Sequence, residues 1–305
     1  MSETTFIATL RALAAHPGAR GLMDDAAVLD IGGAAIVLTH DTIVEGVHFL
    51  PDDPPEDVAW KLVAVNLSDL AAKGAKPLGV LAGYCLTGDD GWDAAFVRGL
   101  RDVLGHYETP LLGGDTVSLP QGAPRVLGLT AIGRADGGAP SRTDARAGDA
   151  LWVTGTIGDA GYGLALLQTG ETTPKAPISA YRRPRPLLLE GSALAPHVHA
   201  MMDVSDGLLI DAARMAEASG LALEIDLDAA PLSPDVLAQP LDGRALRLSA
   251  ATAGDDYQLL FAAAPDMTLP VAATRVGTFA EGAGLTLFDR DGPVPLPEKL
   301  GYLHG

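Results

Sequence analysis

Cysteine is almost absent from this chain, whose 305 residues include only Cys85. A single cysteine excludes an intramolecular disulfide framework, and its place within an apolar run favours a buried, inert thiol in a reducing compartment. The sequence also lacks any run of about 18 apolar residues, so we expect no transmembrane helix. Its first residues lack the basic segment that opens a signal peptide. These absences together predict a cytoplasmic protein.

Basic residues are scarce as well, with 21 Lys and Arg against 39 Asp and Glu and a net charge of −18. This balance disfavours binding to nucleic acid or to an anionic membrane. A phosphate-bearing ligand would therefore need local cations, either bound metal ions or individual arginines. The sequence has no Walker motif and no protein-kinase glycine-rich loop. An ATP-using protein of this kind would hold its nucleotide mainly through metal ions.

The hydrophobic content of 48% is sufficient for a full core, and the length suggests two domains. Strand-like and helical patterns alternate along the chain, which predicts an α/β or α+β fold. We expect the domain boundary in the polar segment 133–148, giving domains 1–140 and 141–305. The principal predicted helices cover 58–73, 92–106 and 208–218, and the principal predicted strands cover 34–39, 78–86, 125–132, 151–155, 221–227 and 259–263.

The segment Met201–Asp211 carries two aspartates, Asp203 and Asp206, before a helical run. Two neighbouring carboxylates repel each other unless a cation lies between them. No Lys or Arg occurs within this segment, so the natural partner is a hard divalent cation such as Mg²⁺. The alternative is a capped helix, in which Ser205 or Asp206 is the N-cap and the following apolar residues form a buried face. The two interpretations can hold together.

Aspartates recur at similar places elsewhere, where a strand-like run ends or a helix is interrupted: Asp24 and Asp25, Asp41, Asp69, and Asp115. If these segments converge, their like charges require metal ions, and several Mg²⁺ ions could bind a polyphosphate. We read Gly113–Thr116 as a turn whose glycines let backbone N–H groups approach a phosphate. The alternatives are a non-catalytic metal-binding protein and acidic residues scattered over the surface.

Several segments resemble, in order along nearly the whole chain, the thiamine-monophosphate kinase family. They are Asp24–Val28, Thr39–Thr42 with His48-Phe49, Ala64–Ala75, Gly113–Thr116, Asp203–Leu208 and Gly254–Tyr257. The resemblance implies an N-terminal α/β domain whose strands form a barrel with a second subunit, and a C-terminal α/β domain. It also implies direct transfer of the ATP γ-phosphoryl group to thiamine monophosphate, giving thiamine diphosphate and ADP. Catalysis would then consist of positioning and charge neutralisation by Mg²⁺.

The resemblance also implies roles for individual residues. The metal ligands would be Asp24, Asp25, Thr39, Asp41, Asp69, Asp115, Asp203 and Asp206, with Asp41, Asp203 and Asp206 most directly involved in catalysis. Contacts to ATP would come from Gly114, Asp115, Arg142, Ser205 and Tyr107. The thiamine phosphate would face His48, Asp255 and Tyr302. Several Mg²⁺ ions are implied, a monovalent cation is left open, and the expected assembly is a homodimer.

The chain departs from the family pattern at three of these places. Met23 replaces a glycine before the aspartate pair, His40 stands where Thr is usual, and Asp255 stands where Glu is usual. The changes at His40 and Asp255 leave open a catalytically inactive magnesium- or nucleotide-binding module. Another ATP-dependent enzyme of the same superfamily is a further alternative. A selenophosphate synthetase-like enzyme would need a reactive N-terminal cysteine, however, whereas Cys85 lies in a predicted strand.

Overall fold

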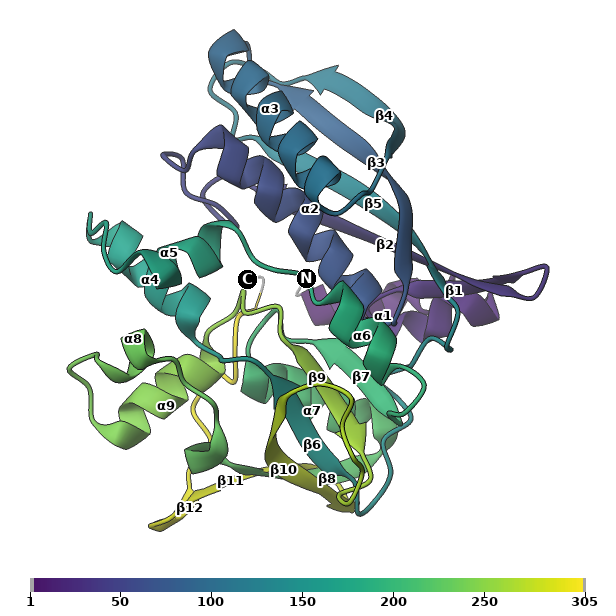
Figure 1. The fold of residues 1–305 in the computed structure, drawn as a ribbon, viewed down its shortest axis with the longest axis vertical. Helices are drawn as coiled ribbons and strands as arrows, with labels where there is room; N and C mark the ends of the chain where they lie inside the picture. The colour runs from purple at the N-terminus through teal and green to yellow at the C-terminus, as the bar shows by residue number, and fades with distance from the viewer. Residues whose placement is uncertain (1–2, 304–305) are drawn as a thin grey trace.

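The computed structural model describes residues 3–303 of the chain, so the first two residues of the segment examined for a signal peptide lie outside it. The chain forms two β-sheets, each packed against helices (Figure 1). This arrangement confirms the predicted fold of two α/β halves. Of the described helices, none is both long and apolar enough to cross a membrane. The barrel shared with a second subunit stays a prediction, because one chain is described.

The N-terminal sheet has five strands, and all its neighbours pair antiparallel except β3 and β4, which pair parallel. In spatial order they are β1 (Ala27–Ile31), β2 (Ala34–Val44), β5 (Val126–Ala135), β3 (Lys76–Leu86) and β4 (Leu111–Ser118). The helices α2 (Pro55–Ala72) and α3 (Asp90–His106) pack together beside this sheet, and α1 (Glu3–Leu10) and the 3₁₀ turn η1 (Pro17–Leu22) precede β1.

The C-terminal sheet has seven strands, which carry a second apolar core. In spatial order they are β12 (Gly292–Val294), β11 (Gly284–Asp289), β8 (Leu221–Asp226), β10 (Ala273–Glu281), β6 (Ala150–Thr154), β9 (Leu259–Ala263) and β7 (Ala200–Asp203). The helical elements of this half are α4 (Asp159–Gln168), α5 (Lys175–Arg182), α6 (Leu188–Leu194), α7 (Leu208–Ser219), η2 (Leu227–Ala229), α8 (Pro234–Leu237) and α9 (Gly243–Thr252).

Helix α2 connects the two halves of the molecule. Pro55 occupies its first turn, where the missing N–H costs nothing, and Glu56 and Asp57 complement the helix dipole there. Its remaining length is buried on nearly every side. The reason is that α2 contacts β2 and β5 of one sheet, β7 and β9 of the other, and the helices α3 and α6.

The predicted turn at Gly113–Thr116 is wrong. These residues form part of strand β4, which pairs with β3 along its length and is exposed at every position. Gly114 is needed for close packing between the strands, because an added Cβ would lie 1.9 Å from the carbonyl O of Ala82. A Gly-Gly-Asp sequence indicates a turn locally, but pairing with β3 overrides that preference.

Close contact between α6 and α2 gives a first testable prediction. A Cβ on Gly191 would lie 2.0 Å from the carbonyl O of Ala71, so Gly191→Ala must push the two helices apart. We expect the free energy of unfolding to fall by about 1–3 kcal/mol, as for other overpacked sites. Urea denaturation measures this change. Gly243→Ala is the matched control because no atom lies within 4 Å of its added Cβ; equal loss in both variants would contradict the packing argument.

Candidate functional site

A cavity of about 680 Å³ lies where the two halves meet. Its walls come from β2, α2, α4, the turn after β7, the segment before β9, and the C-terminal tail. Most of the residues predicted for metal or substrate binding line it: Asp41, His48, Asp69, Asp203, Ser205, Asp206, Asp255 and Tyr302. The acidic segments 41, 69 and 203–206 therefore converge, as the sequence predicted.

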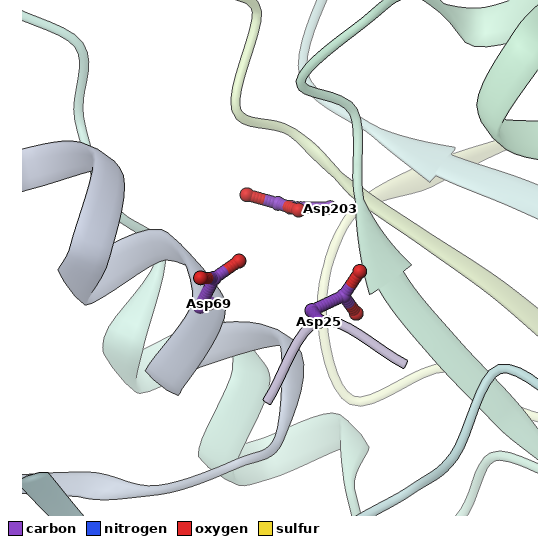
Figure 2. Close-up of side chains that lie close together, drawn as sticks. All are labelled: Asp25, Asp69 and Asp203. Atoms are coloured by element: carbon purple, nitrogen blue, oxygen red, sulfur yellow. The ribbon is translucent and has the colours of Figure 1, made fainter. Parts of the chain in front are cut away.

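At one end of the cavity, three aspartates gather from separate parts of the chain (Figure 2). Asp25 precedes β1, Asp69 is on α2, and Asp203 ends β7; one carboxylate oxygen from each lies within 4.8 Å of the others. Thr39 Oγ1 donates a hydrogen bond to Asp69, and Ser68 Oγ donates one to Asp203. We call Asp25, Asp69 and Asp203 the aspartate cluster.

Burial dominates the electrostatics of this region. Together with the weaker effect of neighbouring carboxylates, it raises the pKa of Asp203 to about 8 and that of Asp41 to about 6. The pKa of Asp69 is raised well above its ordinary value for the same reasons. Burial would also raise the pKa of Asp25, but Arg142 and Lys73 outweigh it and hold that pKa well below its usual range. In the absence of another cation, some carboxyl groups of the cluster therefore stay protonated.

The aspartate cluster fits a hard divalent cation. All its donors are oxygens, which Mg²⁺ prefers, and they come from three rigidly placed segments. Asp25 Oδ2 is buried, and the Lys73 ammonium, 2.7 Å away, occupies only part of its capacity as an acceptor. A buried carboxylate oxygen of this kind retains lone pairs for a metal ion.

Cations from distant segments neutralise the neighbouring aspartates, which the sequence did not indicate. Lys73, fully buried at the end of α2, contacts Asp24 and Asp25 and donates to the carbonyl O of Met201 at 3.0 Å. Arg20 also pairs with Asp24, whose side chain is 1% exposed and lies outside the aspartate cluster. Arg142, predicted for ATP, pairs with Asp25. The sequence feature that could have indicated Lys73 is its position at the end of an apolar helix, directly before Gly74.

The turn that carries Asp206 is held by Asp211, a residue that sequence reasoning missed. Asp211 Oδ2 accepts hydrogen bonds from the backbone N–H groups of residues 205, 206 and 207 at 3.0–3.1 Å. Arg214 pairs with both Asp206 and Asp211. The predicted N-cap role for Ser205 or Asp206 is wrong, because Gly207 is the N-cap of α7. Asp211 could have been found as a charged residue on the buried apolar stripe of α7.

The opposite wall of the cavity is built around Asp255. Lys61, 2% exposed, donates to Asp255 Oδ2 at 2.8 Å and to the carbonyl O of His48 at 2.9 Å. The Tyr257 hydroxyl donates to Asp255 Oδ1 at 3.0 Å, and the Lys61 ammonium lies 3.9 Å from the centre of the Tyr181 ring. Asp255 is thus fixed in orientation by partners on both oxygens.

Some predicted site residues lie elsewhere. Gly114 and Asp115 are on the exposed edge strand β4, and Tyr107 follows α3, where its ring packs against Trp60. None of these three lines the cavity, so a single chain does not bring them to the aspartate cluster. His40, the departure from the family pattern, is exposed and contacts Thr130 rather than the cavity.

Comparison with known proteins places this chain in a family. The models for the N-terminal and C-terminal domains of AIR synthase related proteins match residues 23–135 and 146–285. The thiamine-monophosphate kinase of Caulobacter vibrioides is 39% identical over 310 residues, which cover 95% of this chain and 86% of that relative. The Salmonella typhimurium thiamine-monophosphate kinase is also 39% identical, with 93% and 91% covered. The chain belongs to the thiamine-monophosphate kinase family.

Solved structures of the thiamine-monophosphate kinase family agree with this assignment. One, described as "AaThiL complexed with AMPPCP and TMP", matches with a TM-score of 0.89 at 28% identity and covers 99% of this chain and 97% of its own. A match over the full length of both chains means that the two halves keep the same arrangement in this family member.

Proposed function

We propose that this protein is an ATP-dependent thiamine-phosphate kinase that converts thiamine monophosphate to thiamine diphosphate. The observation that carries the proposal is the convergence of Asp25, Asp69 and Asp203 beside a cavity whose far wall holds His48 and Asp255. One end of the cavity suits a metal-bound polyphosphate, and the other offers fixed polar groups for an organic acceptor. The relatives named as thiamine-monophosphate kinases and the solved complex with AMPPCP and TMP support this choice.

The proposed reaction is direct transfer. An oxygen of the acceptor phosphate attacks the γ-phosphorus of ATP, the bond to the β,γ-bridging oxygen breaks, and ADP leaves. Asp25, Asp69 and Asp203 would hold Mg²⁺, with Asp41 and Asp206 facing the same space; the ion, when bound, neutralises phosphate charge. The protein supplies orientation: Lys61 and Tyr257 fix Asp255, and Asp211 fixes the turn that bears Asp206.

We also propose the homodimer and the division into domains 1–140 and 141–305. The exposed edge strand β4, with Leu111, Leu112 and Val117 at its surface, supports an association with a second copy. Such an association offers the route by which Gly114 and Asp115 could reach an ATP site. The domain division is supported by the interval between β5, which ends at residue 135, and β6, which begins at residue 150.

An assay with purified protein, ATP, Mg²⁺ and thiamine monophosphate tests the function. We expect thiamine diphosphate and ADP to form in equal amounts, and EDTA to abolish the reaction because the aspartate cluster needs a cation to bind polyphosphate. Chromatographic separation of the two thiamine phosphates measures product.

Running the assay in potassium and in sodium salts also tests for a monovalent cation. Nucleotide binding without product would favour the inactive binding module.

A further inference from the structure

Three residues of the C-terminal tail, Lys299, Gly301 and Tyr302, line the cavity. Leu300 packs against the apolar core of the C-terminal half. Gly301 presses against α7 so closely that an added Cβ would lie 2.4 Å from Ile210 Cγ2 and 2.5 Å from the carbonyl O of Asp206. The backbone N–H of Tyr302 donates to that same carbonyl O at 2.9 Å. These contacts hold the preceding residue, Lys299, at the cavity.

Lys299 is the only lysine or arginine on the cavity wall within the part of the chain that the structure describes. The other cations nearby are committed to carboxylates: Lys61 to Asp255, Lys73 and Arg142 to Asp25, and Arg214 to Asp206. Among residues 5–303, whose side chains the structure describes, no acidic group forms an ion pair with the Lys299 ammonium. A cation without a carboxylate partner beside an acidic cavity is available to a bound anion.

We infer that Lys299 binds a phosphoryl group of the substrate held in this cavity, and this inference rests on the function proposed above. A phosphate monoester carries between one and two negative charges near neutral pH and is repelled by the acidic wall. An ammonium group offers three donors and a full charge at the cavity wall, where it offsets that repulsion. The chemistry fits the phosphate of thiamine monophosphate or the polyphosphate of a nucleotide, and the experiment separates these two sources.

The test compares Lys299→Met with Lys299→Arg and with Lys175→Met, an exposed lysine at the start of α5 that does not line the cavity. Calorimetric titration with Mg²⁺ present measures the affinity of each variant for thiamine monophosphate, for thiamine, and for AMPPCP. We expect Lys299→Met to weaken thiamine monophosphate binding about tenfold, the scale of one charged hydrogen bond, and to leave thiamine binding unchanged. Lys299→Arg retains the charge and should recover most of the affinity.

The outcomes separate cleanly. Selective loss of AMPPCP affinity would support the phosphoryl contact and assign it to the nucleotide. Equal weakening of thiamine and thiamine monophosphate, or a loss matched by Lys175→Met, would overturn the inference. In turnover, we expect KM for the phosphorylated substrate to rise while kcat is largely kept. If the wild type is active and Lys299→Met binds and turns over its substrates equally well, only the role of Lys299 is overturned. If the wild type neither binds nor phosphorylates thiamine monophosphate, the proposed function is overturned as well.

Discussion

The Asp203→Asn variant is expected to lose turnover by about a thousandfold or more while remaining folded, as when a group that stabilises transition-state charge is removed. Asp203 is 2% exposed, and its carboxylate is one of the three in the aspartate cluster. Asparagine matches its shape and can still accept the Ser68 hydrogen bond, but it brings no negative charge to a cation. Initial rates at saturating ATP and Mg²⁺ measure the effect.

Folding of this variant can be checked through the pH dependence of stability. Burial raises the pKa of Asp203 from 3.8 to about 8, so the folded state binds a proton more tightly than the unfolded state. In metal-free protein, the stability contributed by this proton is present in full below about pH 4 and is lost as the pH rises through about 8. Asparagine mimics the protonated form of Asp203. The melting temperature of Asp203→Asn should therefore fall less than that of the wild type as the pH rises from about 4 to about 8.

The exposed residue Asp136 provides the control for charge removal, since it lies outside the cavity and pairs with Lys76 and Arg134. Asp136→Asn should turn over like the wild type. Wild-type turnover in Asp203→Asn would reject the aspartate cluster as the catalytic centre. A variant whose circular dichroism showed an unfolded chain would instead contradict the expected stability.

Lys73→Met should reduce the free energy of unfolding of the metal-free protein by about 3–5 kcal/mol, the usual cost of removing one partner of a buried ion pair. The Lys73 ammonium is fully buried between Asp24 and Asp25, so its loss leaves two buried carboxylates with fewer compensating charges. Urea denaturation in the presence of EDTA measures the change. Added Mg²⁺ should restore part of the lost stability, because a cation at the aspartate cluster replaces part of the missing charge.

A second lysine three residues further along makes a close control. The Lys76 side chain is 68% exposed and pairs with the half-exposed Asp136. Surface pairs contribute about 0–1 kcal/mol, so Lys76→Met should change stability little. Similar losses in both variants would mean that the buried ion pairs of Lys73 contribute no more to stability than the exposed pair of Lys76.

The sequence predicted the acidic residues of the site better than their partners. Asp41, Asp69 and Asp203 could be found because each is a charged residue at the end or in the middle of an apolar run, a local pattern. Lys73 and Arg142 reach the aspartates from distant segments, and such pairing depends on how the two halves pack. The sequence predicts a metal ion because few Lys or Arg residues lie near these aspartates along the chain. In the folded protein, Lys73 and Arg142 supply part of the positive charge.

The alternation of strands and helices predicted the α/β or α+β class of the fold, because it depends on residue periodicity within each element. Strand β4 was missed because Gly113 and Gly114 indicate a turn when read locally, while their pairing partner, β3, is distant in sequence. Tyr107 and Asp115 also depend on contacts that are distant in sequence. The family resemblance assigns them to ATP, but within one chain they lie outside the cavity.

Helix α2 carries residues for both ends of the cavity, with Lys61 supporting one wall and Asp69 belonging to the opposite cluster. Eight positions separate them, which corresponds to a rise of about 12 Å along a helix. Since a helix hardly stretches, α2 sets the distance between the wall that holds Asp255 and the aspartate cluster. An insertion of one residue between Lys61 and Asp69 would rotate Asp69 by about 100° about the helix axis and move it out of the cluster.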